Sequence, residues 1–274
     1  MAQAVRRELP SITRAVEAIV KSFRAGGKLF YVGAGTSGRL ATLDAAECPP
    51  TFGTSPARIR AIVAGGARAL RFAVEGAEDF APSGARDLAR AGAGRRDVVV
   101  GISASGATPY VLGALKWARR QRAVTIGVTS NRRSPLARLA QISIAVETGP
   151  EAVAGSTRLK AGTAQKMVLN MLSTAAMARL GRVYENWMVY VALTNKKLRQ
   201  RGARILEEAA GVNSSAAKHA LRQARHSLPA ALVMLKSGAT AQEALHWLRA
   251  SGGNVREAIE AAVRRRSRSK ARVK

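Results

Sequence analysis

A glycine-rich stretch, Gly33-Ala-Gly-Thr-Ser-Gly38, directly follows the apolar run Lys28-Leu-Phe-Tyr-Val32. This order predicts a buried strand, a tight turn and the start of a helix. Such a turn points unpaired backbone N–H groups, and the positive end of a helix dipole, toward an anion. The spacing of the glycines also fits the dinucleotide pattern G-x-G-x-x-G. The first question is therefore which anion the loop binds.

Three interpretations of this loop remain open. A dinucleotide site needs an acidic residue at the end of the next strand, about 20 residues on, to bind the ribose. The next apolar run, 59–63, ends in Ala64-Gly-Gly66 instead. Thr36 and Ser37 place two hydroxyls at the turn, which favours a compact phosphate monoester. The third interpretation is a tight strand-to-helix turn that binds nothing.

A second loop of the same kind follows another apolar run, Asp97-Val-Val-Val-Gly-Ile102. Its residues Ser103, Ser105, Gly106 and Thr108 precede Pro109, which suits the first turn of a helix. One hydroxyl is enough to cap that helix, so capping alone does not explain three hydroxyls and a glycine at this position. Loops after parallel strands meet at the carboxyl ends of the sheet, where open α/β folds bind ligands. Together the two loops favour a phosphorylated small molecule.

Apolar runs alternate with amphipathic stretches through the first half of the chain, which predicts an α/β fold with a parallel sheet covered on both faces. The strands are expected near 28–33, 58–63, 97–102, 123–128 and 141–146. The helices between and around them are expected near 2–25, 37–46, 66–73, 83–91, 109–120 and 135–139.

The pattern becomes wholly helical after residue 158. Helices are expected over 158–181 and 187–209, and then near 214–224, 229–236, 240–249 and 254–263. We therefore expect a ligand-binding domain with flanking helices over 1–210, a small helical bundle over 211–263 and a disordered basic tail over 264–274.

The chain is strongly basic, with a net charge of +28 from 45 basic and 17 acidic residues. Seven of the eleven residues of 264–274 are basic, so this tail is expected to bind nucleic acid non-specifically. The field of the remaining charge favours an anionic substrate, although a solvated basic surface explains it equally well. A single cysteine and the lack of a long apolar run favour a cytoplasmic protein that does not enter a membrane.

Two acidic side chains are candidates for acid–base chemistry. Glu47 lies in the segment Asp44–Thr51, where Pro49 and Pro50 are expected to end the first loop's helix; Glu78 belongs to a second acidic cluster. A pair of carboxylates near a phosphate site suits general acid–base catalysis. Each of them is by itself more typical of a surface glutamate.

Other reactive groups contribute less. Cys48 has no histidine near it in the sequence, because His219, His226 and His246 all lie far along the chain, so it is expected to be structural. The histidines are not spaced as metal ligands. The polar entry to the long helix contains Ser156, Arg158 and Lys160, which are candidate ligand contacts. Alternatively, Ser156 or Thr157 caps that helix, and the two basic side chains face water.

Taken in order, these motifs resemble the N-acetylmuramic acid 6-phosphate etherases, which belong to the sugar isomerase (SIS) superfamily and are related to the glucokinase regulatory protein. The matching segments are YVGAGTSGRLATLDAAECPPTFGT (31–54), AVEGAED (73–79), VVVGISASGATPYV (98–111) and GSTRLKAGTAQKMVLNMLST (155–174). The resemblance implies a three-layer SIS fold with a five-stranded parallel sheet and a small C-terminal helical module.

The resemblance also implies roles for particular residues. Glu47 corresponds to the family's proton donor and Glu78 to its second active-site carboxylate. The hydroxyls at Thr36, Ser37, Ser103, Ser105 and Thr108 correspond to those that bind the sugar phosphate. The reaction cleaves the ether between D-lactate and C3 of the sugar, needs no metal or cofactor, and is expected of a homodimer. The second family loop usually reads SGRTPY, whereas Ala107 stands here in place of the arginine.

Two other functions compete with the etherase. A non-catalytic sugar-phosphate sensor with the same fold would bind the phosphate without needing Glu47 or Glu78. A nucleic-acid-binding protein would depend on the basic tail, and its affinity would fall steeply with salt.

Overall fold

The computed structural model describes residues 1–193 and 195–271, the last four of these by their backbone only. The chain divides into two compact units. The first comprises residues 1–48 and 55–176, and the second comprises residues 49–54 and 177–274. The boundary thus falls earlier than the one expected near residue 210, and helix α8 (Lys196–Ala210) belongs to the second unit.

A five-stranded parallel sheet forms the centre of the first unit and confirms the expected α/β class. Its strands lie in the order β2-β1-β3-β4-β5 and fall where the apolar runs predicted them. Their bounds are Leu29–Gly33 (β1), Ile59–Val63 (β2), Val98–Ile102 (β3), Val124–Thr129 (β4) and Ile142–Ala145 (β5). β1 and β3 are buried along their whole length, as expected of central strands covered on both faces.

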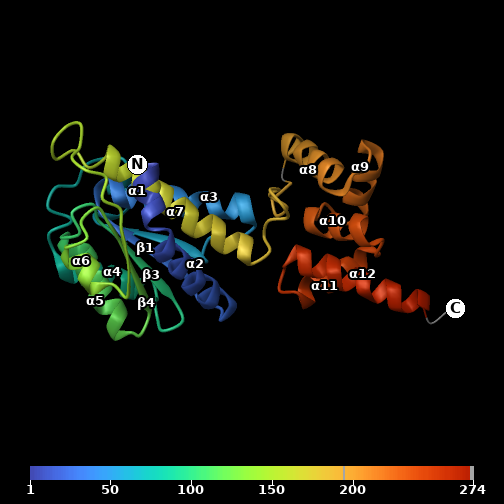
Figure 1. Cartoon of the computed structure of the whole chain (residues 1–274), viewed down its shortest axis with the longest axis horizontal. Coiled ribbons are helices and arrows are strands. Elements are labelled where there is room, and N and C mark those ends of the chain that lie inside the picture. Colours follow the sequence, from blue (N-terminus) through green and yellow to red (C-terminus); the bar gives the residue numbers. More distant parts are fainter. Residues whose placement is uncertain (194, 272–274) are drawn as a thin grey trace. The chain divides into compact units, whose positions relative to one another are not determined.

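Helices cover both faces of this sheet, which gives three layers (Figure 1). One layer contains α2 (Leu9–Arg24), α3 (Gly35–Phe52) and α7 (Lys160–Arg179). The other contains α4 (Ala81–Arg90), α5 (Pro109–Arg120) and α6 (Pro135–Leu139). On this second side Phe30, Val99 and Leu115 belong to one buried apolar cluster, so α5 packs directly on the central strands.

Several element boundaries differ from those expected. The first helix is two, α1 (Ala2–Arg7) and α2, because Pro10 begins a new helix and Glu8 turns inward between them to accept a hydrogen bond from the Ala145 N–H. Residues 66–70 form a short 3-10 helix instead of a longer α-helix. Pro49 and Pro50 do not end α3, which continues to Phe52. The turn after them closes with a bond from the Gly53 N–H to the Pro49 carbonyl, so the prolines cost the helix two hydrogen bonds without breaking it.

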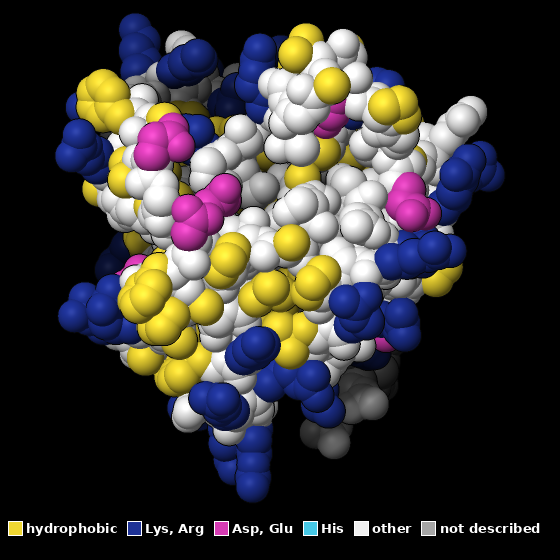
Figure 2. Space-filling view, turned by 90° about the vertical axis from the view of Figure 1, so that its left-hand side faces the viewer, with side chains coloured by type: hydrophobic (Ala, Val, Ile, Leu, Met, Phe, Trp, Pro, Cys, Tyr) yellow, Lys and Arg dark blue, Asp and Glu magenta, His cyan; other side chains and the backbone are white. Residues whose placement is uncertain are grey.

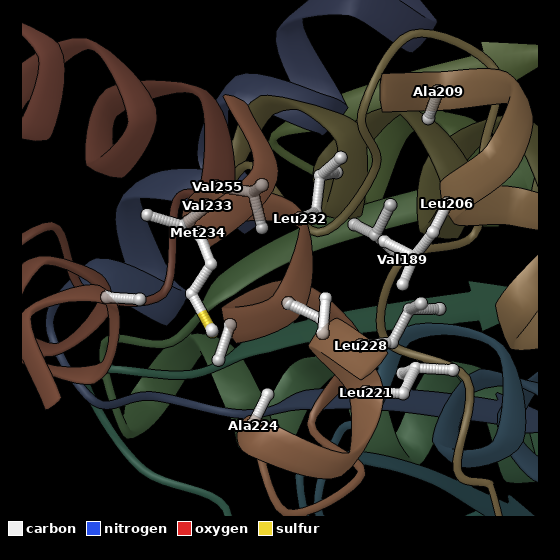
Figure 3. Packing of buried hydrophobic residues seen from close by; sticks show 14 of the residues in the cluster. Val189, Leu206, Ala209, Leu221, Ala224, Leu228, Leu232, Val233, Met234 and Val255 are labelled. Atoms are coloured by element: carbon white, nitrogen blue, oxygen red, sulfur yellow. The ribbon is translucent and has the colours of Figure 1, made fainter. Parts of the chain in front are cut away.

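The second unit is a helical module around its own core. It contains α8, α9 (Ser214–Gln223), α10 (Leu228–Ser237), α11 (Ala241–Ala250) and α12 (Val255–Ala271). Leu206, Leu221, Leu228 and Leu232 meet in this core, with α10 in the middle of it (Figure 3). The helix expected from residue 187 begins only at Lys196, because Asn195 caps it by accepting a bond from the Leu198 N–H.

The basic tail is also ordered differently from the expectation. Helix α12 extends through residue 271, although residues 264–274 were predicted to be disordered. The i to i+4 pair of Arg264 with Glu260 supports this extension. Residues 272–274 of the predicted tail lie outside the described residues.

A buried carboxylate ties α3 to the sheet and to α7. Asp44 accepts hydrogen bonds from the Tyr31 hydroxyl (2.9 Å) on β1, and from Asn170 Nδ2 (2.8 Å) and Ser173 Oγ (3.0 Å) on α7. Burial raises the pKa of Asp44, and these three bonds and Lys166 oppose that rise. Asp44 therefore helps to fix α3 against the sheet and α7.

Replacing Asp44 tests this dependence. Asp44→Ala removes the acceptor of the buried Tyr31 hydroxyl and of the partly buried Asn170 amide, and leaves Ser173 only its 3.4 Å bond to the Asn170 carbonyl. At about 1–3 kcal/mol for an unsatisfied buried donor, we expect the free energy of unfolding to fall by about 2 kcal/mol or more. Asp44→Asn keeps an acceptor for Asn170 and Ser173 and should cost much less. Urea unfolding followed by Trp117 fluorescence, in a background with Trp187→Phe and Trp247→Phe, reports on the first unit. Equal losses in both variants would contradict the role of the hydrogen bonds.

The raised pKa of Asp44 also predicts that the stability of the protein depends on pH. Because the folded-state pKa of Asp44 is raised, the folded protein keeps this proton to a higher pH than the unfolded chain does. Its contribution to stability is therefore greatest below the ordinary aspartate pKa of about 3.9 and falls as the pH rises through the raised pKa. We expect the wild type to lose stability relative to Asp44→Asn as the pH rises, and the opposite slope would contradict the raised pKa.

Candidate functional site

The two glycine- and hydroxyl-rich loops begin side by side at the carboxyl edge of the sheet. β1 and β3 are paired neighbours, and Gly33 lies opposite Ile102 in their register. The first loop turns so tightly that a Cβ on Gly33 would meet the Gly38 nitrogen at 2.8 Å, and one on Gly38 would meet Val63 Cγ1 at 2.6 Å. Glycine at both positions allows α3 to begin immediately above the strand.

The first loop presents free backbone donors. Helix α3 starts at Gly35, and the first N–H to be bonded within the turn is that of Gly38, which donates to the Ala34 carbonyl. The N–H groups of Gly35, Thr36 and Ser37 are those that a helix start leaves without intrahelical partners. Together with the helix dipole they form a site for an anion.

The two hydroxyls of this loop differ. Thr36 is partly exposed, whereas Ser37 is buried and donates its hydrogen to Gln165 Oε1 at 2.9 Å. Gln165, on α7, is 3% exposed, and its Nε2 has no hydrogen-bond partner among the described residues. Ser37 thus orients the Gln165 amide behind the loop, where its Nε2 is buried and has no acceptor among the described residues.

In the second loop, Ser103 connects the other members of the group. Its Oγ accepts the Gly106 N–H at 3.0 Å and lies 2.9 Å from Thr108 Oγ1 and 3.3 Å from Ser105 Oγ. Gly106 has a φ of 67°, and a Cβ there would meet Ser134 Oγ at 2.2 Å, so only glycine fits this turn. The loop therefore holds its three hydroxyls together at the start of α5, where Pro109 occupies the first turn.

A cavity of about 230 Å³ opens beside the first loop and contains Glu78. Its lining residues are Ala34, Gly35, Arg39, Ala64, Ala69 and the segment 72–79. The Glu78 carbonyl accepts the Tyr110 N–H at 2.9 Å, which fastens this segment to the start of α5. Arg39 donates to the carbonyls of Leu70 and Phe72 and holds its other side. Three carboxylates, those of Glu75, Glu78 and Asp79, thus share one cavity with the Arg39 cation next to the anion-binding turn.

Glu47 does not line this cavity. It is exposed on α3, twelve residues after the helix start at Gly35, or about 18 Å along the axis at 1.5 Å per residue. The structure thus does not bring Glu47 and Glu78 of one chain together at the loop. Neighbouring Cys48 is buried, and burial, followed by the Asp44 charge, raises the pKa of its thiol to about 12. A thiol with so high a pKa is not a nucleophile, as the sequence indicated.

The start of α7 already has an anion of its own. The Glu151 carboxylate accepts the Lys160 N–H at 2.8 Å and the Ala161 N–H at 2.9 Å, and these bonds lower its pKa. Lys160 Nζ donates to the Pro150 carbonyl at 2.8 Å. Ser156 is partly exposed and lies in a turn, with its N–H bonded to the Val153 carbonyl. Lys160 therefore holds the entry loop of α7, and Ser156 does not cap the helix.

Three residues at the site escaped the sequence reasoning: Arg39, Glu151 and Gln165. Arg39 follows the first loop directly, so its place in the motif was a usable signal. Gln165 and Glu151 lie more than a hundred residues from that loop, and only the fold shows where they act. Among the described residues, no group of three His, Cys, Asp or Glu side chains could bind a metal ion. No helix in the described part of the chain is long and apolar enough to cross a membrane.

Comparisons with known proteins agree with this geometry. The family model of the glucokinase regulatory protein N-terminal SIS domain matches residues 11–119, and that of the SIS domain matches residues 72–175. Among solved structures, a putative phosphosugar isomerase involved in capsule formation from Bacteroides fragilis has a TM-score of 0.51 at 24% identity, covering 68% of this chain and 88% of that one. A phosphoheptose isomerase from Neisseria gonorrhoeae has a TM-score of 0.50 at 18% identity, covering 65% and 90%. These two show the SIS fold.

Relatives in sequence are much closer. An N-acetylmuramic acid 6-phosphate etherase of Geobacillus thermodenitrificans is 50% identical over 94% of this chain and 87% of its own length. One from Mycolicibacterium smegmatis is 51% identical over 95% and 88%. At this identity and coverage, the chain belongs to the family of the N-acetylmuramic acid 6-phosphate etherases.

Proposed function

We propose that this protein cleaves the D-lactyl ether of N-acetylmuramic acid 6-phosphate, giving N-acetylglucosamine 6-phosphate and D-lactate, as in the recycling of cell-wall sugars. The observation that carries the proposal is the identity of about half of all residues with etherases over nearly the whole chain. The site also supports it, because two donor-rich loops begin side by side and the first of them borders a cavity whose lining includes Glu78.

The phosphate binds between the two loops. Its donors in the first loop are the N–H groups at the start of α3 together with Thr36 and Ser37. Its donors in the second loop are Ser103, Ser105, Gly106 and Thr108. Ser37 acts through Gln165, whose Nε2 has no acceptor among the described residues. We infer that a sugar oxygen is that acceptor. Ser156 and Lys160 complete the ligand-binding set from the entry to α7. The site binds the phosphate mainly through neutral donors.

The elimination needs a base and an acid. In the open-chain sugar, the C1 aldehyde acidifies the hydrogen on C2, and Glu78 takes that proton. The C3–O bond then breaks, Glu47 protonates the departing oxygen, and lactate leaves with its hydroxyl restored. Water adds across the resulting C2–C3 double bond, with the hydroxyl on C3 and the proton on C2. The two carboxylates supply both proton transfers.

Replacing Glu47 separates binding from chemistry. We expect Glu47→Gln to slow D-lactate release by about 10²- to 10⁴-fold, the usual contribution of one acid–base group, while the affinity for N-acetylglucosamine 6-phosphate stays near that of the wild type. An enzyme-coupled assay for D-lactate and calorimetric titration measure the two quantities. Glu17→Gln, an exposed glutamate on α2, is the matched control. Near-normal turnover in Glu47→Gln would contradict the assignment.

The length of α3 supports a homodimer with shared sites. Only five bonds separate the phosphorus from C3 of the sugar, a much shorter span than the roughly 18 Å from the loop to Glu47. The Glu47 that protonates lactate therefore comes from a second copy of the chain. Each site then combines the loops and Glu78 of one protomer with the helix α3 of its partner.

Exposed apolar side chains near both carboxylates favour such an interface. Leu43 lies one turn before Glu47, Phe80 lies two residues after Glu78, and Phe72 lines the cavity; Phe72 is 63% and Phe80 59% exposed. On the face that Figure 2 draws, apolar side chains gather together, with separate acidic groups mostly above them and basic side chains around the edge. Apolar side chains of this size are characteristic of interface cores.

Mixing two inactive variants tests the shared site. In a mixture of Glu47→Gln and Glu78→Gln chains refolded together, half of all dimers combine both kinds, and each of these has one intact site and one that lacks both carboxylates. We therefore expect about a quarter of the wild-type activity from the mixture and almost none from either variant alone. If each site lay within one chain, mixing would restore nothing. A sedimentation measurement confirms that the chains have associated.

Ala107 gives a test of the phosphate contact. It is exposed in the second loop, where related etherases usually have arginine, and its N–H donates to Ser105 Oγ at 3.2 Å. We expect Ala107→Arg to lower the KM roughly three- to tenfold through one exposed charge-assisted contact, with kcat almost unchanged. Ala67→Arg adds the same charge at another exposed position. An equal effect of both variants would indicate only a general attraction.

We place the reaction in the cytoplasm, because a charged sugar phosphate does not cross a bilayer unaided. The cluster of arginines at the end of α12, Arg264 to Arg266, favours weak non-specific binding of nucleic acid as a side property. Such binding would weaken steeply with added salt, whereas ether cleavage would not.

A further inference from the structure

A groove between α8 and α9 of the second unit is surrounded by cations. Its lining residues are Lys196, Arg199, Gln200, Ala203, Lys218, Leu221, Arg222 and His226, and its volume is about 360 Å³. Ala203 and Leu221 form a buried apolar floor, and the basic side chains stand exposed around it. No acidic residue lines the groove.

The cations lie on two helical stripes that face one groove. On α8, Arg199 lies three residues after Lys196, and Ala203 lies four residues after Arg199. On α9, Leu221 and Arg222 lie three and four residues after Lys218. Like charges at these spacings repel one another and destabilise a helix. An anion bound between the stripes would reverse that effect.

These charges are not satisfied within the protein. Within the described part of the chain, none of the four Lys and Arg side chains forms an ion pair or a side-chain hydrogen bond. The acidic residue of α8 that forms an ion pair, Glu208, is bonded to Arg204. The groove thus combines an apolar floor with four uncompensated positive charges.

The backbone at one end of the groove is also unusual. Arg225 and His226 have φ values of 50° and 61°, in the left-handed region that residues other than glycine rarely adopt. The His226 N–H closes α9 by donating to the Leu221 carbonyl at 2.8 Å. This turn fixes His226 at the wall of the groove. Left-handed residues and a bond of this kind are a common way for a helix to end.

We propose that this groove binds an organic polyphosphate with a planar or apolar body, the class to which nucleoside triphosphates belong. The apolar floor takes the body, and the cations of the rim take the phosphates. The volume lies in the range of sites for small molecules, about 300–1,000 Å³. The proposal is independent of the etherase reaction and concerns a site in the other unit of the chain.

Calorimetric titration of the full chain with ATP tests the proposal. N-acetylglucosamine 6-phosphate is present at saturation, so that the two loops of the first unit are occupied. We expect one ATP site per chain, weaker binding of pyrophosphate, and no measurable binding of adenosine. Lys218→Gln with Arg222→Gln should weaken ATP binding at least about tenfold, the effect of losing a charge-assisted contact.

A matched double variant controls for net charge. Arg201→Gln with Arg249→Gln removes two exposed charges of the same unit outside the groove, and ATP affinity should then stay near that of the wild type. If the variant Lys218→Gln with Arg222→Gln fails to fold by circular dichroism, Lys196→Gln with Arg199→Gln replaces it. Absent ATP binding, or equal weakening by the groove and control variants, would overturn the proposal. Pyrophosphate binding as tightly as ATP would overturn the role of the apolar floor.

Discussion

The length and anchoring of helix α3 are the constraint on which the candidate site depends. Its first residues supply the N–H groups of the phosphate loop, and Glu47 lies about three turns further along the same rigid element. Asp44 fixes the helix against β1 and α7 through three hydrogen bonds. Because a helix neither shortens nor bends to bring its two ends together, one chain cannot present both to one small sugar. In the homodimer that we propose, a two-fold axis sets the far end of one helix beside the near end of its partner's helix.

Burial around Asp44 also explains which groups of α3 are reactive. Desolvation raises the pKa of Asp44, of Cys48 and of the Tyr31 hydroxyl, and these buried groups act in packing and hydrogen bonding. Glu47, one turn beyond Asp44, is exposed and free to meet a ligand. The same helix therefore has a buried face, which contains Asp44 and Cys48, and an exposed face, on which we place the proposed acid Glu47.

The sheet could be predicted from the sequence because short continuous apolar runs between helices, such as the one that forms β1, are typical of buried parallel strands. It predicted both loops, since glycine and hydroxyl groups after a strand act locally. It was wrong about the end of α3, where the lost bonds of Pro49 and Pro50 are few and the last turn closes through Gly53. It missed Gln165, because its meeting with Ser37 depends on tertiary packing that no local pattern encodes. The distance between Glu47 and the first loop likewise follows from α3, which begins at Gly35 and continues past Glu47. The sequence had predicted a shorter helix, over 37–46.

The two candidate anion sites use different physics. The loops of the first unit offer backbone N–H groups and hydroxyls, which are neutral, directional and held by glycine turns that admit no side chain. The groove of the second unit offers four exposed charges over an apolar floor. Mobile ions screen exposed charges strongly and fixed dipoles at short range much less. We therefore expect the first arrangement to select by shape and to lose little affinity in salt, and the second to select by charge and to weaken as the ionic strength rises.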